Sequence, residues 1–170
     1  DKPPGLTAHP AAGQPDGTLA NALLAHYPEM EGVGGPRRSG IVHRLDKGTS
    51  GLMVVARNAG SHAVLTRQFK ERRVTKRYLA LVEGEVAHAR GVIEAPLGRH
   101  PRHRQRMAPV TQGRPASTPY RVVERYADHT LVEASPLTGR THQIRVHFAA
   151  LGHPLSGDAT YGGRRPGLTR

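Results

Sequence analysis

The helices and strands that the sequence predicts do not alternate regularly, and this order is what most restricts the fold. Alternating apolar residues predict strands at 74–82, 92–94, 120–126 and 130–134, which follow one another without helices between them. Strands in such runs pair in antiparallel fashion, whereas regular alternation of strand and helix builds parallel sheets. We therefore expect an α+β fold with a largely antiparallel, mixed β-sheet and flanking helices and loops.

The other elements are assigned from caps, breakers and periodicity. A helix is expected from a cap at Asp16 or Thr18 to about residue 27, where Pro28 ends it. A second helix is expected to start at Ser61, as its cap, and to reach about residue 71. A short strand at 41–42, a buried strand at 52–57 and a loop-like segment at 95–118 complete the assignment of the regions before residue 119.

Residues 141–151 have two possible structures. Ile144, Val146 and Phe148 alternate as in a strand, but Ile144, Phe148 and Leu151 also share one face of a helix. The helix is favoured because Gly152, followed by Pro154, is a typical helix stop.

Positive charge dominates the composition, with a net charge of +12 over 170 residues. Such a surplus favours polyanionic partners, of which RNA, DNA and an anionic membrane are the candidates. No apolar run approaches the ~20 residues of a spanning helix, so we expect no membrane association. Aromatic residues make up only 4% of the chain, which argues against a platform of stacked bases and favours phosphate contacts and base extrusion.

The basic residues form two clusters. One lies in a segment that has no acidic residue from position 95 to 123, and the other is interrupted only by Glu71. Charge runs are usually solvated faces, but clusters of one sign favour a surface that follows RNA phosphates and positions RNA without reading its sequence. The first cluster comprises Arg99, His100, Arg102, His103, Arg104 and Arg106, and the second Arg67, Lys70, Arg72, Arg73, Lys76 and Arg77.

The chain contains no cysteine. Disulfides, thiolate catalysis, iron–sulfur clusters and cysteine-ligated zinc are thereby excluded, and the composition is compatible with a cytoplasmic location. Eleven histidines are present, but none has the spacing of a metal-binding motif, so we expect neither a metal nor another cofactor. His43, His142 and His147 are interpreted as hydrogen-bonding residues of turns and helix ends rather than as acid–base groups.

Asp46 is the only carboxylate between Glu31 and Glu71, and the residues around it are basic. Nearby positive charge stabilises the ionised form of a carboxylate. An ionised carboxylate next to a turn can act as a nucleophile, a base or an electrostatic stabiliser, or it can simply cap the turn. The residues alone leave these roles open.

The segment around Asp46 resembles the catalytic signature of the RluA/RluD-type pseudouridine synthases. The string at 40–54, GIVHRLDKGTSGLMV, carries this resemblance. Further matches occur in order along essentially the whole chain: DKPPGL at 1–6, KRYLALV at 76–82, TGRTHQIRVH at 138–147, and GHPL and GD at 152–158.

The resemblance implies three active-site residues. Asp46 is the nucleophile, Tyr78 packs against the target uracil, and Arg145 pairs with Asp46. Without the resemblance, Tyr78 would be taken as a core residue and Arg145 as part of a structural ion pair. Arg145 lies beside Ile144 at the edge of the apolar stripe, where a guanidinium needs a carboxylate partner.

The resemblance further implies isomerisation of uridine to pseudouridine in structured RNA, with large-subunit rRNA as the expected substrate and tRNA as the alternative. Arg44 takes the space of the flipped base, unless it serves only as a phosphate contact or in a salt bridge. The further RNA-binding residues are His43, Arg102, Arg104, Arg106 and Arg140. The bond-level role of Asp46 stays open: attack on the sugar, addition to the base, or removal of a ribose proton.

Two rival functions remain. A glycosidase-like hydrolase normally needs two carboxylates ~5–9 Å apart, and no second acid lies near Asp46 in the sequence. A catalytically silent RNA-binding or ribosome-assembly module would not require Asp46, Tyr78 and Arg145 together.

Residues 1–170 are interpreted as one catalytic domain of the pseudouridine synthase fold. The abrupt start at Asp1 and the Gly/Arg-rich end at 162–167 predict a fragment of a longer protein, truncated at its C-terminus and lacking the family's N-terminal RNA-binding domain. We expect a monomer.

Overall fold

The computed structural model describes residues 1–162 and divides the chain into two compact units. Unit 1 comprises Asp1–Val74, and unit 2 begins at Thr75. The Gly/Arg-rich end of the sequence lies, apart from Gly162, outside the described residues.

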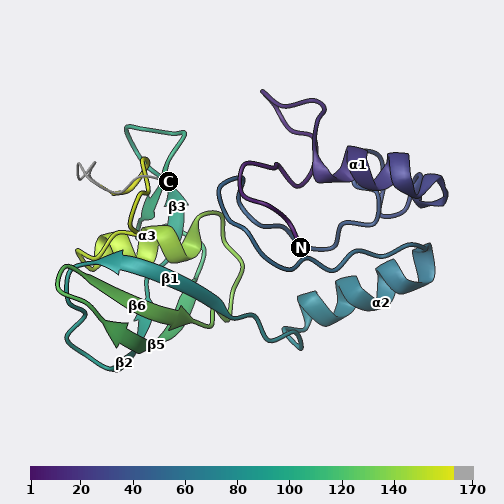
Figure 1. Cartoon of the computed structure of the whole chain (residues 1–170). Helices are drawn as coiled ribbons and strands as arrows, with labels where there is room; N and C mark the ends of the chain where they lie inside the picture. Colours follow the sequence, from purple (N-terminus) through teal and green to yellow (C-terminus); the bar gives the residue numbers. More distant parts are fainter. Residues whose placement is uncertain (163–170) are drawn as a thin grey trace. The chain divides into compact units, whose positions relative to one another are not determined.

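Unit 1 contains helix α1 (Leu19–His26), the short 3₁₀ helix η1 (Pro28–Met30) and helix α2 (Ala59–Lys70) (Figure 1). The predicted first helix is confirmed: Thr18 is its N-cap and forms a capping box with Asn21. The second helix begins earlier than predicted. Its N-cap is Asn58, whose side chain accepts a hydrogen bond from the backbone N–H of Ser61 at 2.8 Å.

The predicted strands at 41–42 and 52–57 are wrong. Only isolated bridges occur there, between Ile41 and Val55 and between Lys2 and Gly51. Leu52 is 83% exposed, and within 52–57 only Ala56 is buried. A continuous ladder is absent from this segment because the N–H of Val54 donates to the imidazole of His43 rather than to a strand.

A close contact at Gly40 holds the long loops of unit 1 together. The Gly40 carbonyl accepts from Ala56 N–H at 2.9 Å, and the Gly40 N–H donates to Val33. Gly40 has a φ of +75°, and a Cβ there would meet the Ala56 oxygen at 1.9 Å. Only glycine fits this position, which lies six residues before Asp46.

Unit 2 contains a four-stranded antiparallel sheet in the order β1-β6-β5-β2. Its strands are β1 (Tyr78–Glu83), β2 (Arg90–Glu94), β5 (Ser117–Arg125) and β6 (His129–Ala134). The predicted antiparallel α+β fold and the hairpin at 120–134 are confirmed. Strand β1 starts four residues later than expected, and Leu79 is 68% exposed, so one face of β1 is not covered.

The segment 95–118 is not entirely loop. It forms a second, two-stranded antiparallel sheet from β3 (Leu97–Arg99) and β4 (Met107–Pro109), and β5 already begins at Ser117. These short strands have little alternating pattern of their own, because Leu97 is the only fully buried residue in either of them.

Helix α3 (Gln143–Ala150) packs on one face of the four-stranded sheet (Figure 1). Phe148 is fully buried in a core with Val82, Val132 and Ala134, and its ring meets that of Tyr120 edge-on at 5.4 Å. The predicted stop at Gly152 is confirmed by a Schellman motif: Gly152 N–H donates to Ala149, and His153 N–H donates to Phe148.

Candidate active site

The predicted catalytic residues are divided between the two units. Asp46 belongs to unit 1, whereas Tyr78 and Arg145 belong to unit 2. Asp46 and Arg145 each have a set of contacts within their own unit.

Asp46 opens a tight turn. Its carbonyl accepts a hydrogen bond from Thr49 N–H at 3.0 Å, and the preceding residue, Leu45, is buried. The turn is joined to the start of the chain by a hydrogen bond from Gly5 N–H to the Lys47 carbonyl at 2.7 Å. Asp46 is thus half-buried on a backbone that is fixed on both sides.

Lys2 binds this turn through the Lys47 carbonyl, a role that the sequence did not predict. It is only 1% exposed, and its ammonium donates to the carbonyls of Pro3, Leu6 and Lys47 at 2.9, 2.9 and 3.3 Å. An ammonium has three donors, so this set satisfies all of them. The Lys2 backbone also exchanges two hydrogen bonds with Gly51, at the end of the turn segment.

The negative charge of Asp46 acts on the ammonium of Lys2. Burial lowers the pKa of Lys2, and the negative charge of Asp46 opposes that shift. The two charges are therefore close enough to interact, and the ammonium is a fixed positive charge near the Asp46 carboxylate.

Two predicted RNA-binding residues lie next to Asp46 in unit 1. Arg44 is exposed. Burial, with the positive charges of Arg44 and Arg38, lowers the pKa of His9, which places three basic groups in one neighbourhood. His43 stacks on Phe69 of α2, with ring centroids 4.6 Å apart, and its Nε2 accepts from Val54 N–H at 3.0 Å. These contacts match the interpretation of His43 as a hydrogen-bonding residue.

Tyr78 is the first residue of β1 and is half-buried. Side chains alternate along a strand, so Tyr78 shares its sheet face with Ala80 and Val82. That is the face on which α3 packs, because both residues contribute to the core around Phe148. Tyr78 therefore points to the face of the sheet that α3, the helix of Arg145, covers.

Arg145 forms a two-pronged ion pair with Asp158. Nε lies 2.7 Å from Oδ2, and Nη2 lies 2.9 Å from Oδ1. The exposed fractions of the side chains are 21% for Arg145 and 5% for Asp158. The sequence predicted Asp46 as the partner of Arg145, with a structural ion pair to any acid as the alternative. It did not single out Asp158, whose only signal was the Gly-Asp pair at 157–158.

A chain of buried hydrogen bonds sets the position of α3. Gln143 Nε2 donates to Thr118 at 2.9 Å, and its Oε1 accepts from the hydroxyl of Thr138 at 2.7 Å and from Arg140 N–H at 3.0 Å. His147 continues the chain, with Nδ1 2.9 Å from the Thr118 hydroxyl and Nε2 3.1 Å from the Ala95 carbonyl. Since a carbonyl only accepts, Nε2 carries the proton and the neutral ring accepts at Nδ1.

The buried His147 predicts a pH dependence of stability. Burial lowers the pKa of His147, against the opposing effect of its hydrogen bond to Ala95. In the unfolded chain a histidine takes up a proton at about pH 6.5, whereas in the folded protein the pKa of His147 is lower. The stabilisation is therefore complete above pH ~6.5 and is lost as the pH falls towards the folded pKa.

Urea unfolding between pH 7.5 and 5.0 measures this effect. We expect the free energy of unfolding to fall less in His147→Gln than in the wild type over this range. The exposed His88 provides the control, and His88→Gln should keep the wild-type pH dependence. An equal pH dependence in all three proteins would contradict the assignment.

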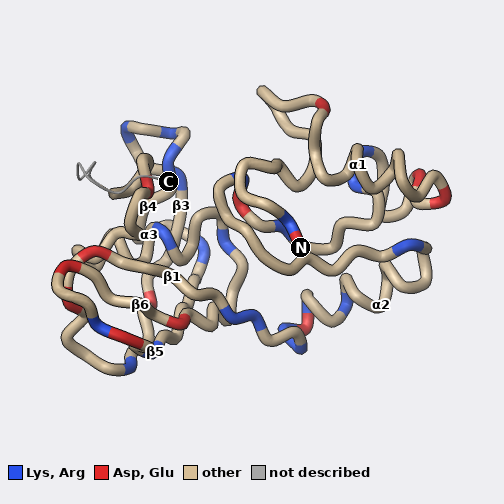
Figure 2. The backbone as a smooth tube through the Cα atoms, viewed as in Figure 1, with Lys and Arg blue, Asp and Glu red and all other residues tan. Residues whose placement is uncertain are grey.

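The predicted basic cluster lies on the β3–β4 hairpin. Residues 101–106 are exposed, and Figure 2 shows only Lys and Arg among the charged residues of this tip. The tip is ordered by hydrogen bonds from His100 N–H to Arg106 and from Arg106 N–H to His103. Arg140, by contrast, is half-buried and donates from Nε to the Pro115 carbonyl at 3.1 Å.

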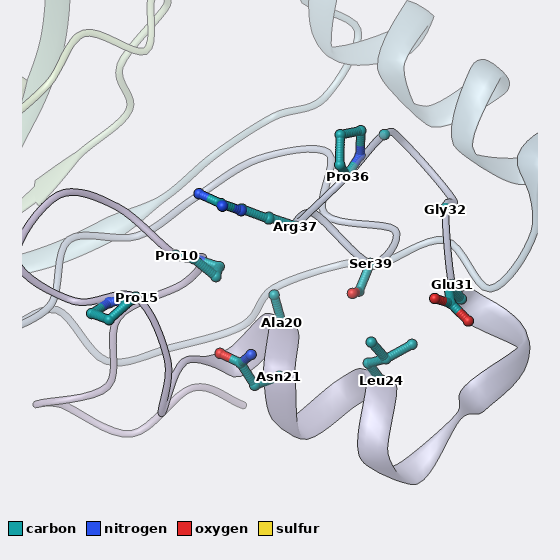
Figure 3. A pocket seen from close by; sticks show the side chains of 11 residues that line it. Pro10, Pro15, Ala20, Asn21, Leu24, Glu31, Gly32, Pro36, Arg37 and Ser39 are labelled. Atoms are coloured by element: carbon teal, nitrogen blue, oxygen red, sulfur yellow. The ribbon is translucent and has the colours of Figure 1, made fainter.

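A cavity of about 560 Å³ lies within unit 1 between α1 and the 31–39 segment. Figure 3 shows Ala20, Asn21 and Leu24 of α1 on one side and Pro36, Arg37 and Ser39 on the other. None of the predicted site residues lines this cavity.

Two further properties concern residues 1–162 only. No group of three or more histidine and acidic side chains is arranged there to hold a metal ion. None of the helices in that range has the length and apolar character required to cross a bilayer.

A solved structure shares this fold. The human RNA Pseudouridylate Synthase Domain Containing 1 superposes with a TM-score of 0.71 and 41% sequence identity, over 86% of this chain and 60% of the human one. The family model for RNA pseudouridylate synthase matches residues 1–150. The chain therefore belongs to the RNA pseudouridylate synthase family.

Curated relatives match over almost the entire chain. Ribosomal large subunit pseudouridine synthase D of Nitrosomonas europaea is 53% identical over 98% of this chain and 47% of its own length. An uncharacterized RNA pseudouridine synthase of Chloroflexus aurantiacus is 52% identical over 99% of this chain and 52% of its own length. The chain thus spans about half the length of these relatives.

Proposed function

We propose that the protein isomerises specific uridines of large-subunit ribosomal RNA to pseudouridine. The observation that carries this proposal is the 53% identity, over 98% of the chain, to a protein named ribosomal large subunit pseudouridine synthase D. The match includes the segments of Asp46, Tyr78 and Arg145. The strongly basic composition and the exposed basic tip at 101–106 suit an RNA substrate.

The reaction is an internal rearrangement. The bond between C1′ and N1 breaks, and a bond between C1′ and C5 forms. C5 loses its hydrogen as a proton, and N1 gains a proton. No redox change or group donor is needed. The protein must therefore supply a group that assists cleavage at C1′, a pocket that holds the detached uracil, and contacts that extrude the nucleotide from its stack.

Each role is assigned to one residue. Asp46 is the nucleophile, on a turn that Lys2 and Gly5 hold in place. Tyr78 packs against the uracil, and Arg145 neutralises the Asp46 carboxylate before it reacts. Exposed Arg44 fills the space of the flipped base, because a planar cation both stacks and binds phosphate.

The direct test incubates the intact protein with transcripts of large-subunit rRNA and, separately, of tRNA. Carbodiimide modification followed by primer extension locates any pseudouridine formed. We expect modification of rRNA at discrete uridines. Binding of rRNA without any pseudouridine would instead identify a silent RNA-binding module, and modification of tRNA alone would overturn the substrate assignment.

The basic tip makes a separate prediction for RNA binding. Replacing Arg102, Arg104 and Arg106 together with glutamine should weaken binding to all structured RNAs. The slope of log Kd against log salt should become less steep by about 2–3, since each phosphate contact contributes ~0.7–0.9. Filter binding at several salt concentrations measures the slope. Arg121→Gln is the control, because Glu133 already holds that guanidinium at 3.0 Å. An unchanged slope in the triple variant would remove the tip from the interface.

A further inference from the structure

The ion pair of Arg145 is much less exposed to water than a second two-pronged arginine pair among residues 75–162. Arg121 and Glu133 have the same paired geometry, with both distances 3.0 Å, but their side chains are 52% and 19% exposed. For Arg145 and Asp158 the corresponding exposures are 21% and 5%. Water competes for the first pair and is largely excluded from the carboxylate of the second.

Asp158 is itself fixed by the backbone around it. Its Oδ1 accepts from Thr160 N–H at 2.9 Å and from Tyr161 N–H at 3.2 Å, which closes a turn. The segment before it is tied to β1, because Glu83 N–H donates to Pro154 and Ser156 N–H donates to Leu81, both at 2.9 Å. The Schellman motif at Gly152 connects that segment rigidly to the end of α3.

Tyr161 covers the face of the guanidinium. Its ring centroid lies 5.0 Å from the Arg145 carbon that bears the three nitrogens. Its hydroxyl accepts from Met107 N–H of β4 at 2.9 Å and lies 2.7 Å from Nδ1 of His142, the N-cap of α3. The carboxylate thus fixes one edge of the guanidinium, and the aromatic ring limits its movement out of plane.

Asp158 stays ionised in this setting. Burial alone would raise its pKa, but hydrogen bonds from Arg145, Thr160 and Tyr161, with the positive charge of Arg145, bring the pKa below its usual value. The ion pair is therefore present at neutral pH and in moderately acidic solution.

We propose that Asp158 is the positioning residue of Arg145 and determines how that guanidinium meets the reacting carboxylate. The pair engages Nε and Nη2 of the guanidinium. A guanidinium that is already oriented loses less side-chain entropy on engaging Asp46, since arginine otherwise has many rotamers. The inference rests on the proposed function, in which Arg145 acts on Asp46.

The test variant is Asp158→Asn. Its amide oxygen can still accept from Thr160 and Tyr161, while its amide nitrogen replaces the oxygen that faces Nε of Arg145. We expect kcat for pseudouridine formation to fall about 100-fold, as for a misplaced catalytic group, with KM for RNA nearly unchanged. Glu133→Gln removes the charge of the matched, exposed pair and should leave both constants at the wild-type level.

A measurement independent of activity accompanies the kinetics. The Nε–H resonance of Arg145, assigned by nitrogen-15 NMR in the intact protein, should exchange with water at least ~10-fold faster in Asp158→Asn than in the wild type. If Asp158→Asn does not fold, Asp158→Ser replaces it, because a serine hydroxyl can also close the turn.

The outcomes separate the two proposals. If the wild type makes pseudouridine and Asp158→Asn has the same kcat, the positioning role is overturned and the proposed function stands. A wild type that makes no pseudouridine overturns the proposed function, and the exchange rate of the Arg145 Nε–H then decides the positioning role alone. A raised KM with unchanged kcat would assign Asp158 to RNA binding and so overturn the proposal.

Discussion

Replacing Asp46 with asparagine is expected to abolish pseudouridine formation and to leave RNA binding unchanged. Asparagine has nearly the same size and keeps the backbone carbonyl that accepts from Thr49 N–H, so the turn survives. Its amide is neutral and is a poor nucleophile, so cleavage at C1′ loses its assisting group. We expect kcat to fall about 10⁴-fold or more, the loss typical of removing a nucleophile.

The control for this variant is Asp16→Asn. Asp16 lies in the same unit and is exposed, so the same chemical change there should leave kcat at the wild-type value. Thermal unfolding and RNA filter binding of all three proteins establish that fold and affinity are retained. Activity of Asp46→Asn within ten-fold of the wild type would mean that another residue attacks the uridine.

The elements that the sequence predicted well are those with local signals. Thr18 and Asn21 form the capping box of α1 within four residues, and Gly152 ends α3 through hydrogen bonds to the preceding turn. The hairpin of β5 and β6 is similarly local, since its turn joins two strongly alternating segments. In each case the residues that decide the structure are neighbours in the sequence.

The failures arise where distant partners decide. The segment 52–57 has the apolar composition of a buried strand, yet it forms only single bridges and leaves Leu52 83% exposed. The start of α2 is a local exception, because Asn58 and Ser61 are both good caps and the observed geometry selects Asn58. Strands β3 and β4 are three residues each and exist only because they pair with each other.

The candidate site shows the same division. Asp46 was recognisable because its motif is contiguous in the sequence. Asp158 and Lys2 were not, because their function depends on partners that folding brings to them. Arg145 lies 13 residues from Asp158, and the Lys47 carbonyl lies 45 residues from Lys2. A backbone carbonyl as partner leaves no trace in the sequence, because every residue has one.

Lys2→Met is expected to destabilise unit 1 and to slow the reaction. Methionine matches the length of lysine but donates no hydrogen bond, so the carbonyls of Pro3, Leu6 and Lys47 lose the buried ammonium. Unsatisfied buried groups of this kind cost about 1–3 kcal/mol each, offset in part because a buried charge is also removed. We expect the free energy of unfolding to fall by about 2–4 kcal/mol.

Lys47→Met separates the buried role from a general loss of positive charge. Lys47 is exposed, and its ammonium donates to the Gln14 side chain at 3.1 Å, while its carbonyl still serves Lys2 in the variant. Urea unfolding should therefore place the free energy of unfolding of Lys47→Met within about 0.5 kcal/mol of the wild type.

In saturating RNA, we also expect a kcat about ten-fold lower for Lys2→Met, because the turn that carries Asp46 loses one of its anchors and a nearby positive charge. Equal stability of the two variants would show that the Lys2 ammonium is dispensable, and the Asp46 turn would then depend on its backbone hydrogen bonds to Gly5 and Thr49 alone.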